Sequence, residues 1–196
     1  MLIYVTNRKL CRDDFLKRME RLAAGKPHAI MLREKDLQDT EYETLAAQVK
    51  EVCAAHQVPL LINQNISTAL KLDLPAIHLS MHNLREYRNE LNSFKQIGAS
   101  VHSLEEALEA QELGAHYLIA GHIFTTDSKK GLPPRGLSFL EEICRQVQVP
   151  VFAIGGITKD NAKDILLTGA KGVCIMSEAM TCEHPKNLAH QFRLEY

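Results

Sequence analysis

Short apolar runs recur at regular intervals along the chain, and the segments between them carry charges. Runs of this length, bounded by turn residues, are typical of strands that are buried on both faces of a parallel sheet. They predict eight strands, at Leu2–Thr6, His28–Leu32, Pro59–Asn63, Ala76–Leu79, Gln96–Ser100, Tyr117–Gly121, Val149–Ile154 and Gly172–Met176.

Most of the intervals predict helices, because apolar residues in them are three and four positions apart. Ser103–Glu106 has the pattern of a capping box and predicts a helix that continues to about Leu113. Thr158–Asn161 predicts the start of another helix, which Gly169 ends. Further helices are predicted at Asp13–Ala24 and Thr40–Ala55, with shorter ones at Asn65–Leu72 and Leu84–Leu91.

Strands that alternate with helices indicate an α/β protein with a parallel sheet. Two architectures remain, a closed (β/α)8 TIM-type barrel and an open doubly wound sheet. Eight strand–helix units match the barrel, and no early GxGxxG segment marks a dinucleotide-binding fold. No low-complexity segment or linker divides the chain, so residues 1–196 are expected to form a single barrel domain.

Composition narrows the functional class. The net charge of −1 gives no support for binding to nucleic acid or to a membrane surface. The chain enters a strand-like run directly at Met1–Thr6, without a signal peptide, and lacks the ~20-residue apolar stretch of a membrane helix. The five cysteines are odd in number and form no CxxC pair, which favours free thiols over zinc or disulfides. We therefore expect a cytoplasmic protein.

The segment Tyr117–Gly131 carries the clearest chemical signal. An apolar strand ends at Gly121, His122 follows it, and a loop with hydroxyls, a carboxylate and two lysines comes next. Barrel enzymes place their chemistry directly after the strands, and a histidine there can move protons at neutral pH. The alternative is a histidine that only forms hydrogen bonds within its loop.

Two further groups of strand-end residues indicate anion binding. Gly155 and Gly156 follow the seventh strand, and Met176 and Ser177 follow the eighth, as in the phosphate site of many barrel enzymes. The alternative for the glycines is a tight turn that needs positive φ. Arg33–Lys35 follows the second strand and supplies two candidate anion contacts, although a solvated charged turn would have the same composition.

These segments together resemble the superfamily of thiamine phosphate synthase and its relative TenI, the thiazole tautomerase, over essentially the whole chain. The resemblance implies a (β/α)8 barrel that binds a thiazole phosphate, with the phosphate near the two glycines. It is carried by Tyr4–Thr6, Leu32–Lys35, Leu61–Asn63, Ile77–Leu79, Val101–Glu106, Gly121–Gly131, Ala153–Ile157 and Met176–Ser177.

The branch of the superfamily depends on a few positions. Synthases join a pyrimidine pyrophosphate to the thiazole phosphate with Mg²⁺, and they carry acids after the third and fourth strands, where this chain has Gln64 and Asn83. Synthases have proline in the place of His122, and the following loop is also closer to the tautomerase. The segment Leu32–Asp36, in contrast, is closer to the synthase.

On this basis the resemblance implies a thiazole tautomerase, an isomerase of thiamine biosynthesis. His122 would be the acid/base residue, and neither a metal nor a cofactor is expected. The expected partner is a small-molecule thiazole phosphate, with a homodimer as the expected assembly. A Mg²⁺-dependent thiamine phosphate synthase and a non-catalytic regulator are the alternatives. The expected substrate-binding residues are Arg33, Lys35, Asn63, Ser100, Thr126, Asp127, Ser128, Lys129, Gly155, Gly156, Met176 and Ser177.

Overall fold

A computed structural model describes residues 1–192 of the protein. The strands form a closed parallel barrel in the order of the sequence, which confirms the (β/α)8 fold and excludes the open sheet. Each strand agrees with its predicted run to within about two residues at either end. The strands are β1 (Leu2–Val5), β2 (Ala29–Leu32), β3 (Leu60–Asn63), β4 (Ala76–Ser80), β5 (Gln96–Val101), β6 (Tyr117–Gly121), β7 (Val151–Ile154) and β8 (Gly172–Ile175).

Helices follow the strands, as the alternating pattern predicts. None of the helices within residues 1–192 has the length and apolar character that crossing a membrane requires. The helices are α1 (Phe15–Ala24), α2 (Asp39–Ala55), α3 (Ile66–Lys71), α4 (Met81–Tyr87), α5 (Leu104–Glu112), α6 (Gly136–Gln146), α7 (Ala162–Leu167), α8 (Ser177–Thr181) and α9 (Pro185–Gln191), with 3-10 turns η1 (Arg8–Leu10), η2 (Arg88–Ser93) and η3 (Asp127–Lys129).

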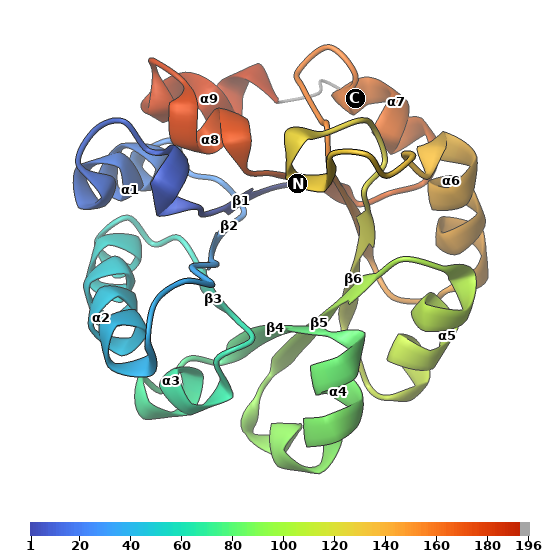
Figure 1. The fold of residues 1–196 in the computed structure, drawn as a ribbon, viewed down its shortest axis with the longest axis horizontal. Helices are drawn as coiled ribbons and strands as arrows, with labels where there is room; N and C mark the ends of the chain where they lie inside the picture. The colour runs from blue at the N-terminus through green and yellow to red at the C-terminus, as the bar shows by residue number, and fades with distance from the viewer. Residues whose placement is uncertain (193–196) are drawn as a thin grey trace. The chain divides into compact units, whose positions relative to one another are not determined.

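The first of two compact units comprises Met1–Leu74 and the segment that starts at Ile175. In this unit α1 packs between α2 and α9 (Figure 1). The buried Arg18 of α1 pairs with Asp13 over 2.6 Å and joins α1 to α8 by donating to the carbonyl oxygen of Ala179 over 3.3 Å. A buried guanidinium needs such partners, and here they hold α8 in place.

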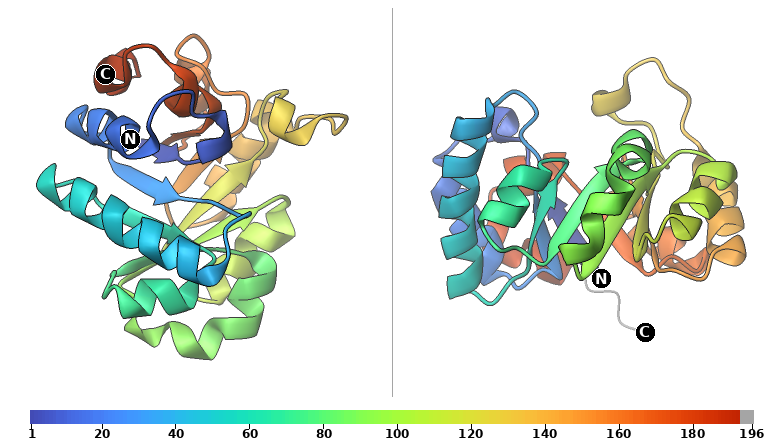
Figure 2. Two further views of the ribbon diagram at one scale, coloured as in Figure 1. Left: turned by 60° about the vertical axis from the view of Figure 1, so that its left-hand side comes forward. Right: turned by 90° about the horizontal axis from the view of Figure 1, so that it is seen from below.

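The second unit comprises Pro75–Cys174, and in it α5 packs between α4 and α6 (Figure 1). Its core includes an aromatic group: His78 stacks on Tyr117 with a centroid distance of 5.6 Å, and Phe152 meets Tyr117 edge-on at 5.9 Å. The segment between β6 and α6, drawn in yellow, extends away from the helices of this unit (Figure 2).

Two helix starts differ from the prediction: α4 begins at Met81 rather than at Leu84, and α7 begins after the predicted residues. The expected start at Thr158–Asn161 is wrong, because α7 begins only at Ala162. The side chain of Asn161 accepts a hydrogen bond from the Thr158 N–H over 2.9 Å and donates to the Gly156 carbonyl oxygen over 3.0 Å. These bonds close a turn after β7, so the residues that were predicted to open the helix form a loop instead.

Candidate functional site

A pocket of about 200 Å³ lies at the carboxyl ends of β2 and β3 in the first unit. Most of the lining residues have polar side chains, with both charge signs and three amides, but most of the surface that they expose to the pocket is apolar. Such a site suits a ligand that combines an apolar body with a few charged or hydrogen-bonding groups. The sequence analysis named Lys35, Asn63 and Gln64 among these residues but gave no role to Tyr42. The lining residues are Glu34, Lys35, Leu37, Tyr42, Asn63, Gln64 and Asn65.

A buried hydrogen-bond network fixes the segment that carries Arg33 and Lys35. Glu34 is 4% exposed, and its Oε1 accepts hydrogen bonds from the Thr6 hydroxyl over 2.6 Å and from the Arg8 N–H over 3.0 Å. The Thr6 Oγ1 in turn accepts from the Arg33 N–H over 2.9 Å. Burial raises the pKa of Glu34, while the bonds from Thr6 and Arg8 oppose that shift.

The alternative interpretation of Arg33–Lys35 as a solvated charged turn is wrong for two of the three side chains. Glu34 is buried, and Arg33 is half-buried. Burial lowers the pKa of Arg33, and within residues 1–192 its guanidinium makes no ion pair or side-chain hydrogen bond. The adjacent Glu34 carboxylate opposes that lowering of the Arg33 pKa. A half-buried cation that makes no ion pair within the described residues is available to bind an anion.

The amides at the end of β3 are placed by a turn and a helix cap. Gln64 has φ +67°, in the left-handed region, and Asn65 accepts from the Thr68 N–H over 2.9 Å at the start of α3. Tyr42 closes the pocket from α2 and donates to the Leu32 carbonyl oxygen over 2.7 Å. Left-handed residues are uncommon outside glycine, and such strain is often found at binding sites.

These residues do not fit a protein-held Mg²⁺ site. Mg²⁺ prefers carboxylate ligands, and the resemblance places acids where this chain has Gln64 and Asn83. Residues 1–192 contain no group of three or more histidines, cysteines or acids that could hold a metal ion. Glu34 is the acid of this pocket, and its oxygens already accept from Thr6 and Arg8.

Met176 and Ser177 lie in the first unit, directly after β8, as expected. Ser177 is exposed and is the first residue of α8, and its carbonyl oxygen accepts from the Thr181 hydroxyl over 2.9 Å. The Ser177 hydroxyl is thus accessible to a ligand.

His122 lies directly after β6 and is half-buried. Its Nε2 is 3.4 Å from the Leu132 carbonyl oxygen, within the loop that follows. Two backbone bonds close the base of this loop, from Arg135 N–H to His122 O and from Gly136 N–H to Ile123 O, both 3.0 Å. The loop displays Thr126 at the start of η3, and its exposed expected site residues are Asp127, Ser128 and Lys129.

Gly155 and Gly156 are required by packing. Their φ angles are +100° and +66°, and a Cβ at Gly155 would overlap the Cβ of His122. At Gly156 a Cβ would overlap the Thr125 carbonyl oxygen, while Phe124 N–H donates to the Gly155 carbonyl oxygen over 3.0 Å. The tight turn considered as the alternative is therefore present, and it holds the segment that follows β6.

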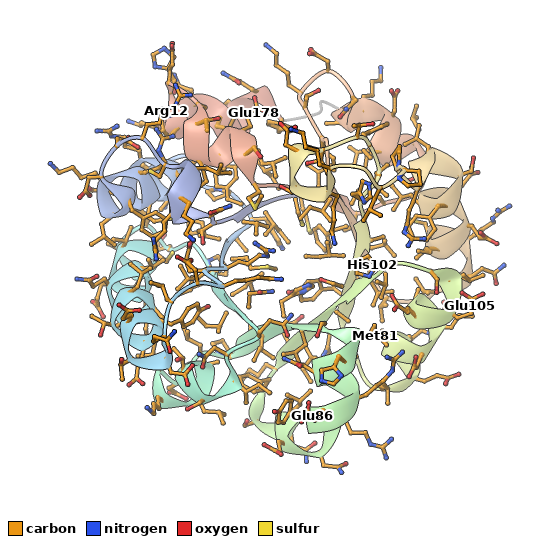
Figure 3. All side chains as sticks on the ribbon, viewed as in Figure 1. Arg12, Met81, Glu86, His102, Glu105 and Glu178 are labelled. Atoms are coloured by element: carbon orange, nitrogen blue, oxygen red, sulfur yellow. The ribbon has the colours of Figure 1, made fainter. Side chains whose placement is uncertain are left out.

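Ser100 and two histidines gather at the ends of β4 and β5. His78 Nε2 lies 2.8 Å from Ser100 Oγ, so this buried histidine forms a polar contact. His102 lies outside that contact, at the start of α5 (Figure 3), with its N–H donating to Glu106 Oε2 over 2.7 Å. Half of the predicted capping box is confirmed, since Ser103 Oγ accepts from the Glu106 N–H over 3.1 Å, whereas the Glu106 side chain accepts from the His102 N–H.

Nearly the whole chain is similar in sequence to known proteins. A family model described as thiamine monophosphate synthase matches residues 2–179. The chain belongs to the thiamine monophosphate synthase family. The superfamily named in the sequence analysis is thereby confirmed, although its TenI branch is not specifically supported.

Individual relatives support the synthase branch. Thiamine-phosphate synthase 2 of Streptococcus pneumoniae is 36% identical over 93% of this chain and 88% of the relative. Thiamine-phosphate synthase of Desulfitobacterium hafniense is 38% identical over 94% of this chain and 91% of the relative. A solved structure, thiamine phosphate pyrophosphorylase from Pyrococcus furiosus, is 30% identical with a TM-score of 0.87 and covers 97% of this chain and 92% of that one.

The prediction of a thiazole tautomerase, and with it the assignment as an isomerase, is contradicted by these relatives. It rested on His122 and on the amides at positions 64 and 83, which are few residues. The identity to the relatives, in contrast, extends over more than nine-tenths of the chain and so includes the core and all the strand ends. The transferase that was kept as the alternative is the better supported interpretation.

Proposed function

We propose that this protein is a thiamine-phosphate synthase, a transferase that joins a pyrimidine pyrophosphate to a thiazole phosphate and releases pyrophosphate. The observation that carries the proposal is the 36% and 38% identity to proteins named thiamine-phosphate synthase, over more than nine-tenths of this chain. The half-buried Arg33 and the exposed Lys35 after β2 support it, because both substrates are anionic, and Lys35 also lines the pocket after β2 and β3.

The departure of pyrophosphate is the step at which the protein must stabilise the most negative charge. The bond between the pyrimidine group and the pyrophosphate breaks, the leaving group takes the electron pair, and a new bond forms to the thiazole. Charge develops on the pyrophosphate oxygens, and fixed cations stabilise it. We assign this role to Arg33 and Lys35, with Asn63 as a hydrogen-bond donor beside them.

The second unit supplies the remaining expected contacts. Ser100 at the end of β5 offers a hydroxyl, and the loop after β6 offers hydroxyls and the Lys129 ammonium. We assign the thiazole phosphate to backbone N–H groups of Gly155 and Gly156 in this unit. Ser177, in the first unit, stays a candidate hydroxyl donor to an anion. His122 contacts the Leu132 carbonyl oxygen within its own loop and remains a candidate site residue.

The direct test is to incubate the purified protein with both substrates and Mg²⁺ and to measure thiamine phosphate and pyrophosphate together. Equal amounts of the two products, formed more slowly by Arg33→Ala at low concentrations of the pyrimidine pyrophosphate, support the proposal. Consumption of the pyrimidine pyrophosphate without thiamine phosphate, or no product at any substrate concentration, contradicts it. Omitting Mg²⁺ shows whether the amides at positions 64 and 83 change the metal requirement. His122→Ala is expected to slow turnover through loss of loop order, without removing the activity.

A further inference from the structure

The contact between His78 and Ser100 joins the core of the second unit to its strand ends. His78 is 1% exposed, whereas Ser100 is half-buried at the carboxyl end of β5. The ring of His78 stacks on the ring of Tyr117, and Gly98 makes room for the Tyr117 ring, because a Cβ at Gly98 would collide with it. The orientation of the imidazole is therefore fixed by packing.

The hydrogen bonds of His78 determine its tautomer. Burial lowers the pKa of His78 to about 3, so the ring is neutral at physiological pH and carries a single N–H. Within residues 1–192 its Nδ1 has no hydrogen-bond partner, whereas Nε2 lies 2.8 Å from Ser100 Oγ. A proton on Nδ1 would leave a buried donor unpaired, which is rarer than an unpaired acceptor. The proton is therefore on Nε2, and His78 donates to Ser100.

We propose that His78 is a positioning residue which, by donating from Nε2 to Ser100 Oγ, leaves the Ser100 hydroxyl hydrogen to be donated to the substrate. Ser100 then recognises an acceptor atom, either a phosphate oxygen or an unprotonated ring nitrogen. With the opposite tautomer, Ser100 would donate to His78 and would accept from a substrate donor. The substrate part of this inference rests on the proposed function, whereas the tautomer part does not.

The tautomer can be measured without any ligand. Long-range ¹H–¹⁵N spectra of protein labelled with ¹⁵N-histidine distinguish the two neutral forms and the imidazolium. The signal of His78 is identified by its loss in His78→Phe. We expect the Nε2-protonated neutral form from pH 5 to pH 8, with a shift of that signal in Ser100→Ala. A proton on Nδ1, or an imidazolium in this range, overturns the inference.

Binding of thiamine phosphate, measured by calorimetry, tests whether His78 acts through Ser100. We expect His78→Phe and Ser100→Ala each to weaken binding by about 3- to 10-fold, and the double variant to be no weaker than Ser100→Ala. His78→Gln keeps a donor near the Nε2 position and should restore part of the affinity. Additive losses in the double variant overturn the positioning role.

His116→Phe is the matched control. His116 also bonds to β5, since its Nδ1 accepts from the Ile97 N–H over 3.1 Å, but it lies at the opposite end of the strand from Ser100. Its replacement should leave binding unchanged. If the wild-type protein neither binds thiamine phosphate nor forms it, the proposed function fails, and the histidine spectra still decide the tautomer. If His78→Phe does not fold, His78→Gln replaces it in both experiments.

Discussion

The hydroxyl of Thr6, at the end of β1, donates a 2.6 Å hydrogen bond to the buried carboxylate of Glu34, which follows β2. The same oxygen of Thr6 accepts from the Arg33 N–H over 2.9 Å. One small side chain thereby connects two neighbouring strand ends and sets the backbone from which Arg33 and Lys35 project.

Thr6→Val is expected to lower the free energy of unfolding by about 1–3 kcal/mol, because it leaves the Glu34 carboxylate and the Arg33 N–H short of a partner. The substitution keeps the shape of the side chain. Urea denaturation measures the effect, and Thr44→Val is the control, because Thr44 is exposed on α2 and bonds only to the Thr40 carbonyl oxygen. Equal effects of the two substitutions would show that the network adds no stability.

Arg33→Ala is expected to raise KM for the pyrimidine pyrophosphate by about 10- to 100-fold, since it removes a charge-assisted contact to the leaving group. Steady-state kinetics measure this change. Arg85→Ala is the control, because Arg85 pairs with Glu109 at the surface over 2.6 Å and should alter KM by less than about 2-fold. A KM unchanged in Arg33→Ala would place the pyrophosphate elsewhere.

Gly156→Ala is expected to destabilise the protein by about 2–4 kcal/mol, because a Cβ adds a collision with Thr125 to the cost of positive φ. Gly131→Ala isolates the second cost. Gly131 has φ +83° and open space around its Cβ position, so about 1 kcal/mol is expected there. Thermal denaturation compares the two variants. A Gly156→Ala variant as stable as Gly131→Ala would show that the segment after β6 moves aside without cost.

His78 makes stability depend on pH. Its folded pKa, about 3, lies below the unfolded value of 6.5, so the unfolded chain binds more protons between these values. The contribution of His78 to stability is therefore complete above pH 6.5 and is lost as pH falls towards 3, by up to about 1.4 kcal/mol per pH unit. Urea denaturation from pH 7.5 to pH 5 should give a smaller slope for His78→Phe. Parallel pH profiles would contradict the shift.

Local patterns determined the strands and most of the helices, because burial on both faces of a parallel sheet leaves uninterrupted apolar runs in the sequence. The helix cap at Ser103 could also be predicted from the sequence, since its hydrogen bond joins residues only three positions apart. The start of α7 could not be predicted from local patterns. Asn161 bonds back to Gly156 and closes a turn, and the choice between a turn and a helix start depends on how that segment packs.

The sequence alone determined the barrel, the residues that follow its strands and the membership of the family, because periodicity and motifs are local properties of the chain. Tertiary structure decided what the side chains at those positions do. From the sequence, Glu34 looks like an exposed charge in a polar turn. In the structure it is buried and bonded to Arg8 and Thr6, which lie 26 and 28 positions away in the chain. The sequence places His78 within an apolar strand, and its bond to Ser100 exists only because β4 pairs with β5 in the folded protein. Hydrogen bonds between distant segments carry no local signature, because they depend on the register of strands that the fold brings together.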